Sequence, residues 1–270
     1  MPKPNDGPFS VMIREMLTLV DVAGLFVDPV FYGMSGPRGN GKIVVVIPGL
    51  FGSDLYLQPL HKWLRCAGYT PVESSLNFNA GCLQRLSGQV LDQISSHMNG
   101  DSSSIALIGH SRGGALAWAL ASHFQARVSH LVMLGSPVAS IMASVESGKP
   151  VTTPHLGQTS RALMRFSSLV RHALDPDCDY PRCGCAFVSD VTRPLSPATS
   201  ILSIYGRDDL IVAKEAQITE GETLEVNASH VGLVYSPEVY RAIGKFLSCT
   251  GATENGRKAG MTDLREDPGL

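Results

Sequence analysis

The chain has 270 residues, of which 44% are hydrophobic and 17% charged, and its formal net charge is −2. This length and apolar content can supply one large core. A charge so close to zero gives no reason to expect nucleic acid or an anionic membrane as a partner. No run of about 18 uncharged apolar residues predicts a membrane-spanning helix. The N-terminal residues lack the basic and long apolar regions of a signal peptide, so we expect a cytoplasmic protein.

Strands and helices are expected to alternate along most of the chain. Short runs of apolar residues, several of them β-branched, predict strands at residues 42–47, 70–73, 104–108, 130–134, 201–205 and 223–226. Helical spacing of apolar residues predicts helices at residues 9–26, 57–64, 83–94, 114–121 and 162–173, and one that opens at 236–238. Ser236 is expected to cap the last helix, with proline at its first position. This alternation is typical of an α/β fold, with a mostly parallel central sheet and helices on both faces.

The interval at about residues 138–198 interrupts the alternation. It holds one amphipathic helix, followed by a loop rich in Asp, Pro and Cys. We expect this insertion to form a small helical lid above the strand ends. Residues 1–249 would then be a single domain, with the apolar helix at 9–26 docked on its body. The polar segment 250–270 is expected to be a disordered tail.

The most informative motif is Gly-His-Ser-Arg-Gly at residues 109–113, which fits the pattern G-x-S-x-G. It follows the predicted strand at 104–108 and precedes the predicted helix at 114–121. A strand, a tight turn and a helix are the context of a nucleophile elbow. The flanking glycines are expected because side chains there would clash with the neighbouring strand and helix. We therefore predict that Ser111 is a catalytic nucleophile; an ordinary glycine-rich turn is the alternative.

A serine hydroxyl is a poor nucleophile until a positioned base accepts its proton, so a histidine should accompany Ser111. His230 follows the last predicted strand, at the end of the sheet where ligand sites form. His110 belongs to the turn itself and is expected to point away from the serine. Other histidines fall within predicted helices or have no such context: His61, His97, His123, His130, His155 and His172. His230 is therefore the predicted base.

The carboxylate that orients the histidine is expected after the strand at 201–205. Two neighbours, Asp208 and Asp209, lie there. Either could accept a hydrogen bond from the imidazole, and the other would be a turn-forming or solvated residue. The residues alone leave both candidates open.

The six cysteines form two groups. Three are expected to be scattered small core residues: Cys66, Cys82 and Cys249. Three others cluster near His172: Cys178, Cys183 and Cys185. A paired C-x-x-C is absent from this cluster, so free thiols are favoured, with a disulfide or a zinc site as alternatives.

Taken together, these motifs resemble the α/β-hydrolase superfamily, with most similarity to bacterial lipases and esterases. The resemblance covers about residues 43–247 and includes the segments 48–52, 109–113, 206–212 and 229–233. The carboxylate motif of that family has Gly, two variable residues, Asp and an apolar pair, which selects Asp209. The family's oxyanion hole would use the backbone N–H groups of Leu50 and Arg112. Many members have His-Gly before the first of these residues, whereas this chain has Pro48 and Gly49.

The resemblance implies a serine esterase or lipase-like hydrolase. Ser111 would form an acyl-enzyme with a carboxylic ester or thioester, His230 would act as the base and Asp209 would orient it. The substrate is expected to be a small molecule with an apolar acyl group, and neither a metal ion nor an organic cofactor is required. An acyltransferase or biosynthetic thioesterase with the same triad is one alternative. A non-catalytic binding protein is another, and the intact triad disfavours it.

Overall fold

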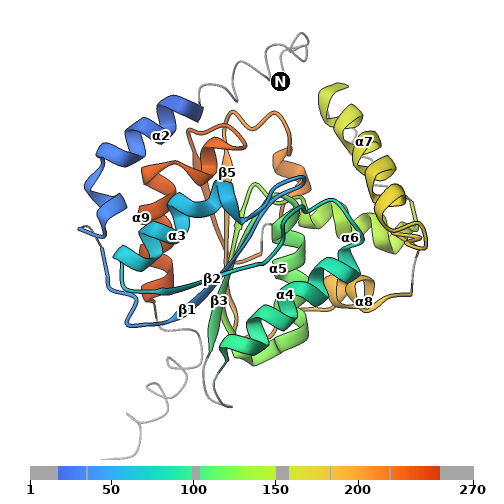
Figure 1. The fold of residues 1–270 in the computed structure, drawn as a ribbon, viewed down its shortest axis with the longest axis horizontal. Coiled ribbons are helices and arrows are strands. Elements are labelled where there is room, and N and C mark those ends of the chain that lie inside the picture. Colours follow the sequence, from blue (N-terminus) through green and yellow to red (C-terminus); the bar gives the residue numbers. More distant parts are fainter. Residues whose placement is uncertain are drawn as a thin grey trace, which may run out of the picture.

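The computed structural model describes residues 18–34, 36–98, 104–149, 158–182, 184–218 and 220–249 (Figure 1). The predicted N-terminal helix is described from α2 (Thr18–Val27) onward, and its Leu25 is completely buried against the body. Its earlier part and the predicted tail at 250–270 lie outside the described residues. Among the helices that the structure describes, none is both long and apolar enough to cross a membrane.

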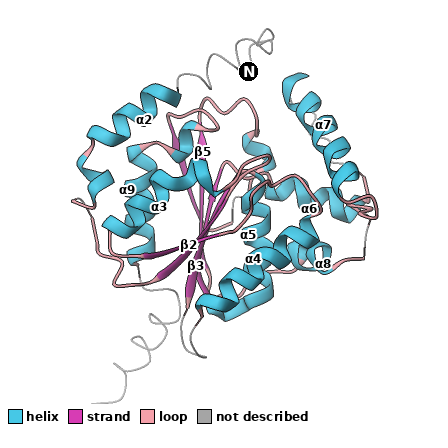
Figure 2. Cartoon of the chain, viewed as in Figure 1, coloured by secondary structure: helices cyan, strands magenta, loops and turns pink. Residues whose placement is uncertain are grey.

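Every predicted strand is present in one parallel sheet, in the order β2-β1-β3-β4-β5-β6. The strands are β1 (Ile43–Ile47), β2 (Thr70–Glu73), β3 (Ile105–His110), β4 (Val128–Leu134), β5 (Ser200–Gly206) and β6 (Glu222–Val226). Helices cover both faces of this sheet (Figure 2). The predicted α/β class with a mostly parallel sheet is therefore confirmed.

The helices α3 (Gln58–Cys66) and α9 (Pro237–Ser248) pack on one face of the sheet, together with α2 (Figure 1). The opposite face carries α4 (Leu83–His97), α5 (Arg112–Phe124) and α8 (Ala186–Thr192). The interval predicted as an insertion contributes α6 (Val138–Ser147) and α7 (Gln158–Leu174) as well as α8. Short 3-10 helices complete the connections: η1 (Pro29–Tyr32), η2 (Asp54–Leu57), η3 (Gln125–Arg127), η4 (Lys214–Ala216) and η5 (Gly232–Val234).

Side chains that alternate along each strand contribute to the hydrophobic cores on both faces of the sheet. In β1, Val44 and Val46 join the core beneath α3 and α9, whereas Val45 and Ile47 join the core beneath α4 and α5. Successive strand side chains point to opposite faces, so a strand buried on both sides needs a continuous apolar run. This requirement explains the uninterrupted sequence from 43 to 47.

The start of α9 has the predicted serine and proline positions but no side-chain capping bond. Ser236 occupies the N-cap position, and Pro237 follows as expected, but the serine side chain makes no capping hydrogen bond. The helix is held instead by its buried face, which includes Tyr240 and Ile243. Packing of an apolar face supplies most helix stability in proteins, so a missing side-chain cap is tolerated.

The turn between β3 and α5 leaves no room for a side chain at Gly109 or Gly113. A Cβ on Gly109 would lie 2.5 Å from the carbonyl oxygen of Gly113, and a Cβ on Gly113 would lie 2.5 Å from the carbonyl oxygen of Pro48. These neighbours are backbone atoms and cannot move aside cheaply. The steric reason predicted for both glycines is therefore confirmed.

We expect Gly113→Ala to lower the free energy of unfolding by about 1–3 kcal/mol, as overpacking of a tight contact usually does. The matched control is Gly88→Ala in the interior of α4, where a Cβ would meet no atom within 4 Å. That change should raise stability by roughly 0.5–1 kcal/mol, because alanine favours helix over glycine. Urea denaturation of both variants measures the difference. Equal midpoints for Gly113→Ala and the wild type would contradict the tight turn.

The core also contains histidines that burial keeps neutral. His61 in α3 is completely buried, and neither of its ring nitrogens has a hydrogen-bond partner among the described residues. Burial is the main cause that lowers its pKa from 6.5 to about 4. Burial first, and then the positive charge of Lys42, lower the pKa of His130 to about 4 as well. Both side chains therefore bind protons more readily in the unfolded chain than in the folded one.

This difference predicts a loss of stability in mild acid. Below pH 6.5, His61 and His130 bind protons in the unfolded chain but not in the folded core. The free energy of unfolding should therefore fall as the pH decreases toward 4. His61→Leu removes one such group and should flatten this dependence, by about 2 kcal/mol between pH 7.5 and pH 5. Urea melts of both proteins at the two pH values give the comparison, and parallel stability curves would exclude the buried, neutral state of His61.

Candidate active site

The predicted site residues meet at the carboxyl ends of the strands, around one cavity. Its volume is about 460 Å³, within the usual range for small-molecule sites. Ser111 and His230 both line it. Most of its wall is apolar and includes Leu83, Ile141, Leu163, Met164, Val212 and Val231. The structure therefore brings two residues that are 119 positions apart in the chain into one apolar pocket.

Ser111 occupies the sharp turn between β3 and α5. Its φ of 53° and ψ of −126° lie in a region that residues with a side chain rarely adopt, at a typical cost of about 1–3 kcal/mol. The serine N–H donates to the carbonyl of Leu134 at 2.8 Å, and its carbonyl accepts from the N–H of Gly114 at 2.9 Å. These bonds hold the strained turn in place. Ser111 is only 9% exposed, and it lines the cavity.

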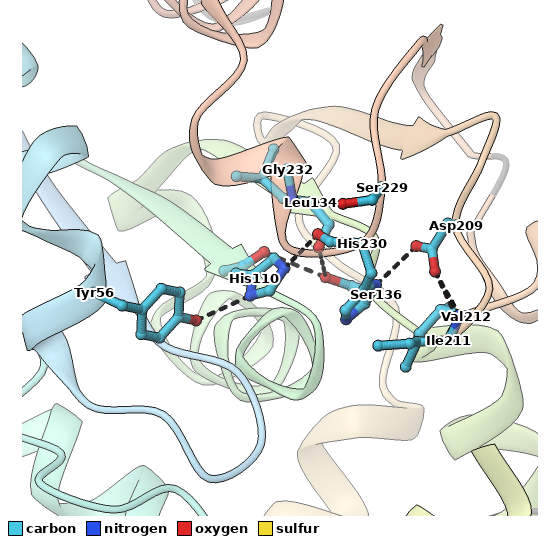
Figure 3. Close-up of polar contacts among 11 residues, drawn as sticks. Tyr56, His110, Leu134, Ser136, Asp209, Ile211, Val212, Ser229, His230 and Gly232 are labelled. Atoms are coloured by element: carbon cyan, nitrogen blue, oxygen red, sulfur yellow. Dashed lines mark hydrogen bonds and ion pairs between the residues drawn. The ribbon is translucent and has the colours of Figure 1, made fainter. Parts of the chain in front are cut away.

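Asp209 and His230 form a buried pair (Figure 3). His230 Nδ1 lies 2.7 Å from Asp209 Oδ2, and the two side chains are 5% and 2% exposed, respectively. The other carboxylate oxygen accepts the backbone N–H groups of Ile211 at 2.9 Å and Val212 at 2.8 Å. Asp208, the second candidate from the sequence, is exposed. Of the two aspartates, it is Asp209 that the structure places against the histidine.

The loop after β1 and the first turn of α5 carry the two backbone amides predicted for an oxyanion hole. Leu50 lies in the loop and lines the cavity, as does Arg112, the first residue of α5. The amides on either side of Leu50 are occupied, because Gly49 donates to Tyr56 Oη at 2.7 Å and Phe51 donates to the carbonyl of Asn79 at 2.9 Å. The first amides of a helix have no partner within the helix and carry its positive dipole end.

Asn79 connects the two sides of this predicted oxyanion hole, and sequence analysis did not identify it. Its side-chain amide donates to the carbonyl of Pro48 at 2.7 Å. The guanidinium of Arg112 donates to both the carbonyl and the side-chain oxygen of Asn79 at 3.0 Å, and to the carbonyl of Gly81 at 2.6 Å. Burial lowers the pKa of Arg112 to about 10, so the side chain remains charged at neutral pH. Asn79 is buried in an irregular loop, where no sequence periodicity reports burial.

The helix α7 forms one wall of the cavity through Leu163 and Met164. Two of its other apolar residues, Phe166 and Leu169, are 58% and 69% exposed. The ring centroid of Phe166 lies 5.6 Å from that of Phe51, a residue that lines the cavity. The apolar residues of this predicted amphipathic helix are therefore divided between the cavity and the surface.

The cysteines differ from the predicted grouping. Cys249 is exposed and Cys66 is only partly buried, so neither is a core residue. Cys82 contacts the thiol of Cys178, and its N–H donates to Asp175 at 2.6 Å. Among the cysteines that the structure describes, the thiols of Cys66, Cys82, Cys178 and Cys249 are free. Cys183 lies outside the described residues. Within the described part of the chain, no group of three or more His, Cys, Asp or Glu residues could hold a metal ion.

His110, which precedes Ser111, makes two side-chain contacts within the site. Its ring is buried, with Nδ1 2.9 Å from Tyr56 Oη and Nε2 3.0 Å from the main-chain oxygen of His230 (Figure 3). The rings of His110 and His230 are 4.9 Å apart. Strand alternation offers a signal for this placement, since His110 lies two residues after Ile108 and points to the same face of β3.

The comparisons with known proteins bear on the fold that surrounds this site. Residues 90–154, which include the Ser111 turn, match the family model for the alpha/beta hydrolase fold. No curated protein sequence gives a significant match. Among solved structures, polyneuridine aldehyde esterase is similar at a TM-score of 0.50 and 13% identity, over 76% of this chain and 98% of that chain.

Two further structures show the same likeness. Est1E from Butyrivibrio proteoclasticus has a TM-score of 0.50 and 16% identity, over 78% of this chain and 88% of its own. A metagenomic carboxyl esterase has a TM-score of 0.50 and 14% identity, over 78% and 77% of the two chains. The local family match and the similar structures show that this chain has the α/β-hydrolase fold.

Proposed function

We propose that this protein is a serine hydrolase that cleaves a carboxylic ester or thioester through an acyl-enzyme on Ser111. One observation carries the proposal: the strained serine turn and the buried Asp209–His230 pair meet at a single apolar cavity. The structurally similar proteins named as esterases are consistent with it. An ordinary glycine-rich turn would not need a strained serine or a buried carboxylate partner for a cavity-lining histidine.

The hydrogen bond to Asp209 determines which nitrogen of His230 can act as a base. An ionised carboxylate only accepts hydrogen bonds, so the proton of the neutral imidazole resides on Nδ1. This leaves Nε2 with the lone pair that accepts the proton of Ser111. When the imidazole becomes charged, the carboxylate of Asp209 stabilises it. Water activated in the same way would then release the acyl group.

The negative charge that develops on the substrate oxygen would be stabilised by the amides of Leu50 and Arg112. Loss of one such donor typically costs about 3 kcal/mol of transition-state stabilisation. The dipole of α5 acts in the same direction, since its N-terminus begins at Arg112. The apolar wall favours an apolar acyl group. We further propose that the insertion between β4 and β5 serves as a lid, with α7 closing the acyl site.

Ser111→Ala should abolish labelling by a fluorophosphonate probe and lower ester turnover by several orders of magnitude. Asp209→Asn should lower turnover by about 10⁴-fold, because the histidine loses the partner that fixes its tautomer. Asp208→Asn is the matched control, since this neighbour is exposed, and it should remain close to wild type. Hydrolysis of aryl esters and acyl thioesters measures all three. A wild-type protein that neither labels nor turns over any of these compounds would rule out the proposed function.

Leu163 and Leu169 provide a matched test of the acyl site, because both belong to α7 and only Leu163 is among the cavity residues. Leu163→Ala should enlarge the cavity and shift the preferred acyl chain toward longer or bulkier groups. Leu169 is 69% exposed, so Leu169→Ala should leave the preference unchanged. A chain-length series of aryl esters gives the profile of each variant. An identical shift in both variants would mean that the effect is not local to the cavity.

A further inference from the structure

Two side chains outside the proposed triad link the two loops that must be aligned for catalysis. Tyr56, from η2, accepts the N–H of Gly49 at 2.7 Å through its hydroxyl oxygen. The same hydroxyl lies 2.9 Å from Nδ1 of His110, and Nε2 of His110 lies 3.0 Å from the carbonyl oxygen of His230. A continuous chain of hydrogen bonds therefore runs from the loop that carries Leu50 to the main chain of the proposed base.

The position of each proton in this chain follows from the chemistry of its members. A carbonyl oxygen can only accept, so His110 must carry a proton on Nε2 and donate it to His230. Burial first, and then the neighbouring His230, lower the pKa of His110 to about 3, so its ring is neutral and Nδ1 is unprotonated. Nδ1 must then accept from the hydroxyl of Tyr56. Burial raises the pKa of Tyr56, so the phenol keeps the proton that it donates.

Tyr56 is itself fixed from a second direction. Its main-chain carbonyl accepts the hydroxyl of Tyr235 at 3.0 Å. Tyr235 lies immediately after η5, in the segment that follows His230. The ring of Tyr56 also contacts that of His110 edge to face, with centroids 5.8 Å apart. Both the side chain and the backbone of Tyr56 are thus joined to the strand ends that carry the serine and the histidine.

We propose that Tyr56 and His110 are positioning residues, which hold the loop at Gly49 and Leu50 in register with the loop of His230 on either side of Ser111. We call the hydrogen-bond chain from Gly49 through Tyr56 and His110 to His230 the relay. This inference rests on the proposed function, because it assigns the relay to the same site. Neither residue is required to exchange a proton with the substrate. Their contribution is to keep the oxyanion donor and the base aligned before the substrate arrives.

Nitrogen-15 NMR of histidine-labelled protein tests the relay without reference to activity. We expect the ring of His110 to remain neutral, with its proton on Nε2, from pH 8 down to about pH 5. His110→Gln identifies this signal by removing it. Tyr56→Phe should shift the signals of both His110 and His230, because it breaks the chain at its centre. A His110 ring that carries its proton on Nδ1, or a His230 signal unaffected by Tyr56→Phe, would overturn the proposal.

Kinetics separate positioning from a purely structural role. Tyr56→Phe should lower kcat by roughly 10–100-fold with little change in KM, as expected for misalignment in the transition state. The matched control is Tyr240→Phe, which also removes a buried hydroxyl, one without a hydrogen-bond partner in the described part of the chain. That variant should retain the wild-type kcat. Equal kcat values for Tyr56→Phe and Tyr240→Phe would contradict the proposal.

A rescue experiment provides the second kinetic test. The amide of glutamine supplies one donor and one acceptor, as neutral His110 does, whereas leucine supplies neither. His110→Gln should therefore retain much more of the wild-type kcat than His110→Leu, and equal losses would contradict the relay. If the wild type itself shows no turnover and no fluorophosphonate labelling, the proposed function fails. The NMR signals would then decide the relay independently.

Discussion

The close approach of Gly113 to the end of β1 is the contact on which the rest of the site depends. The backbone of Gly113 lies so near the carbonyl oxygens of Ile47 and Pro48 that no side chain fits between them. This contact brings the first turn of α5 against the loop that carries Leu50. It also holds Ser111 in its strained conformation, because β3 before the serine and α5 after it are both fixed. The proposed oxyanion hole combines amides from two distant segments, so it needs a contact that fixes the two backbones relative to each other.

Periodicity and chain order revealed the frame of this molecule. Strands such as β1 and β4 are buried on both faces, so their apolar runs are long enough to identify them. The Ser111 turn could be predicted because it requires glycine at two nearby positions, 109 and 113. His230 followed from its place after the last strand. Asp208 and Asp209 are adjacent in sequence, and it was the family pattern rather than the spacing that favoured Asp209.

The residues that sequence analysis missed act through contacts between irregular loops. Tyr56 and His110 are 54 positions apart, and Arg112 and Asn79 are 33 positions apart. Neither Tyr56 nor Asn79 lies in a periodic apolar pattern from which its burial could be predicted. The amphipathic pattern of α7 misled for a related reason, because a helix at the rim of a cavity has apolar residues on its exposed face as well. Local sequence patterns predict which side of a helix or strand is buried, but they do not predict which distant loops contact each other.

The sheet order has a consequence for how the site can open. Among the described strands, β6 pairs only with β5, so the loop bearing His230 follows an edge strand, whereas Ser111 follows a strand in the middle of the sheet. Exposed charges border this edge, where Glu225 pairs with Arg207 at 2.9 Å and Lys214 at 3.8 Å. Edge strands with few buried side chains exchange with solvent more readily than central ones. Local fraying of β6 would therefore move the loop of His230 away from the cavity while the turn of Ser111 stayed folded, so the opening of this one strand would limit the lifetime of the proposed triad.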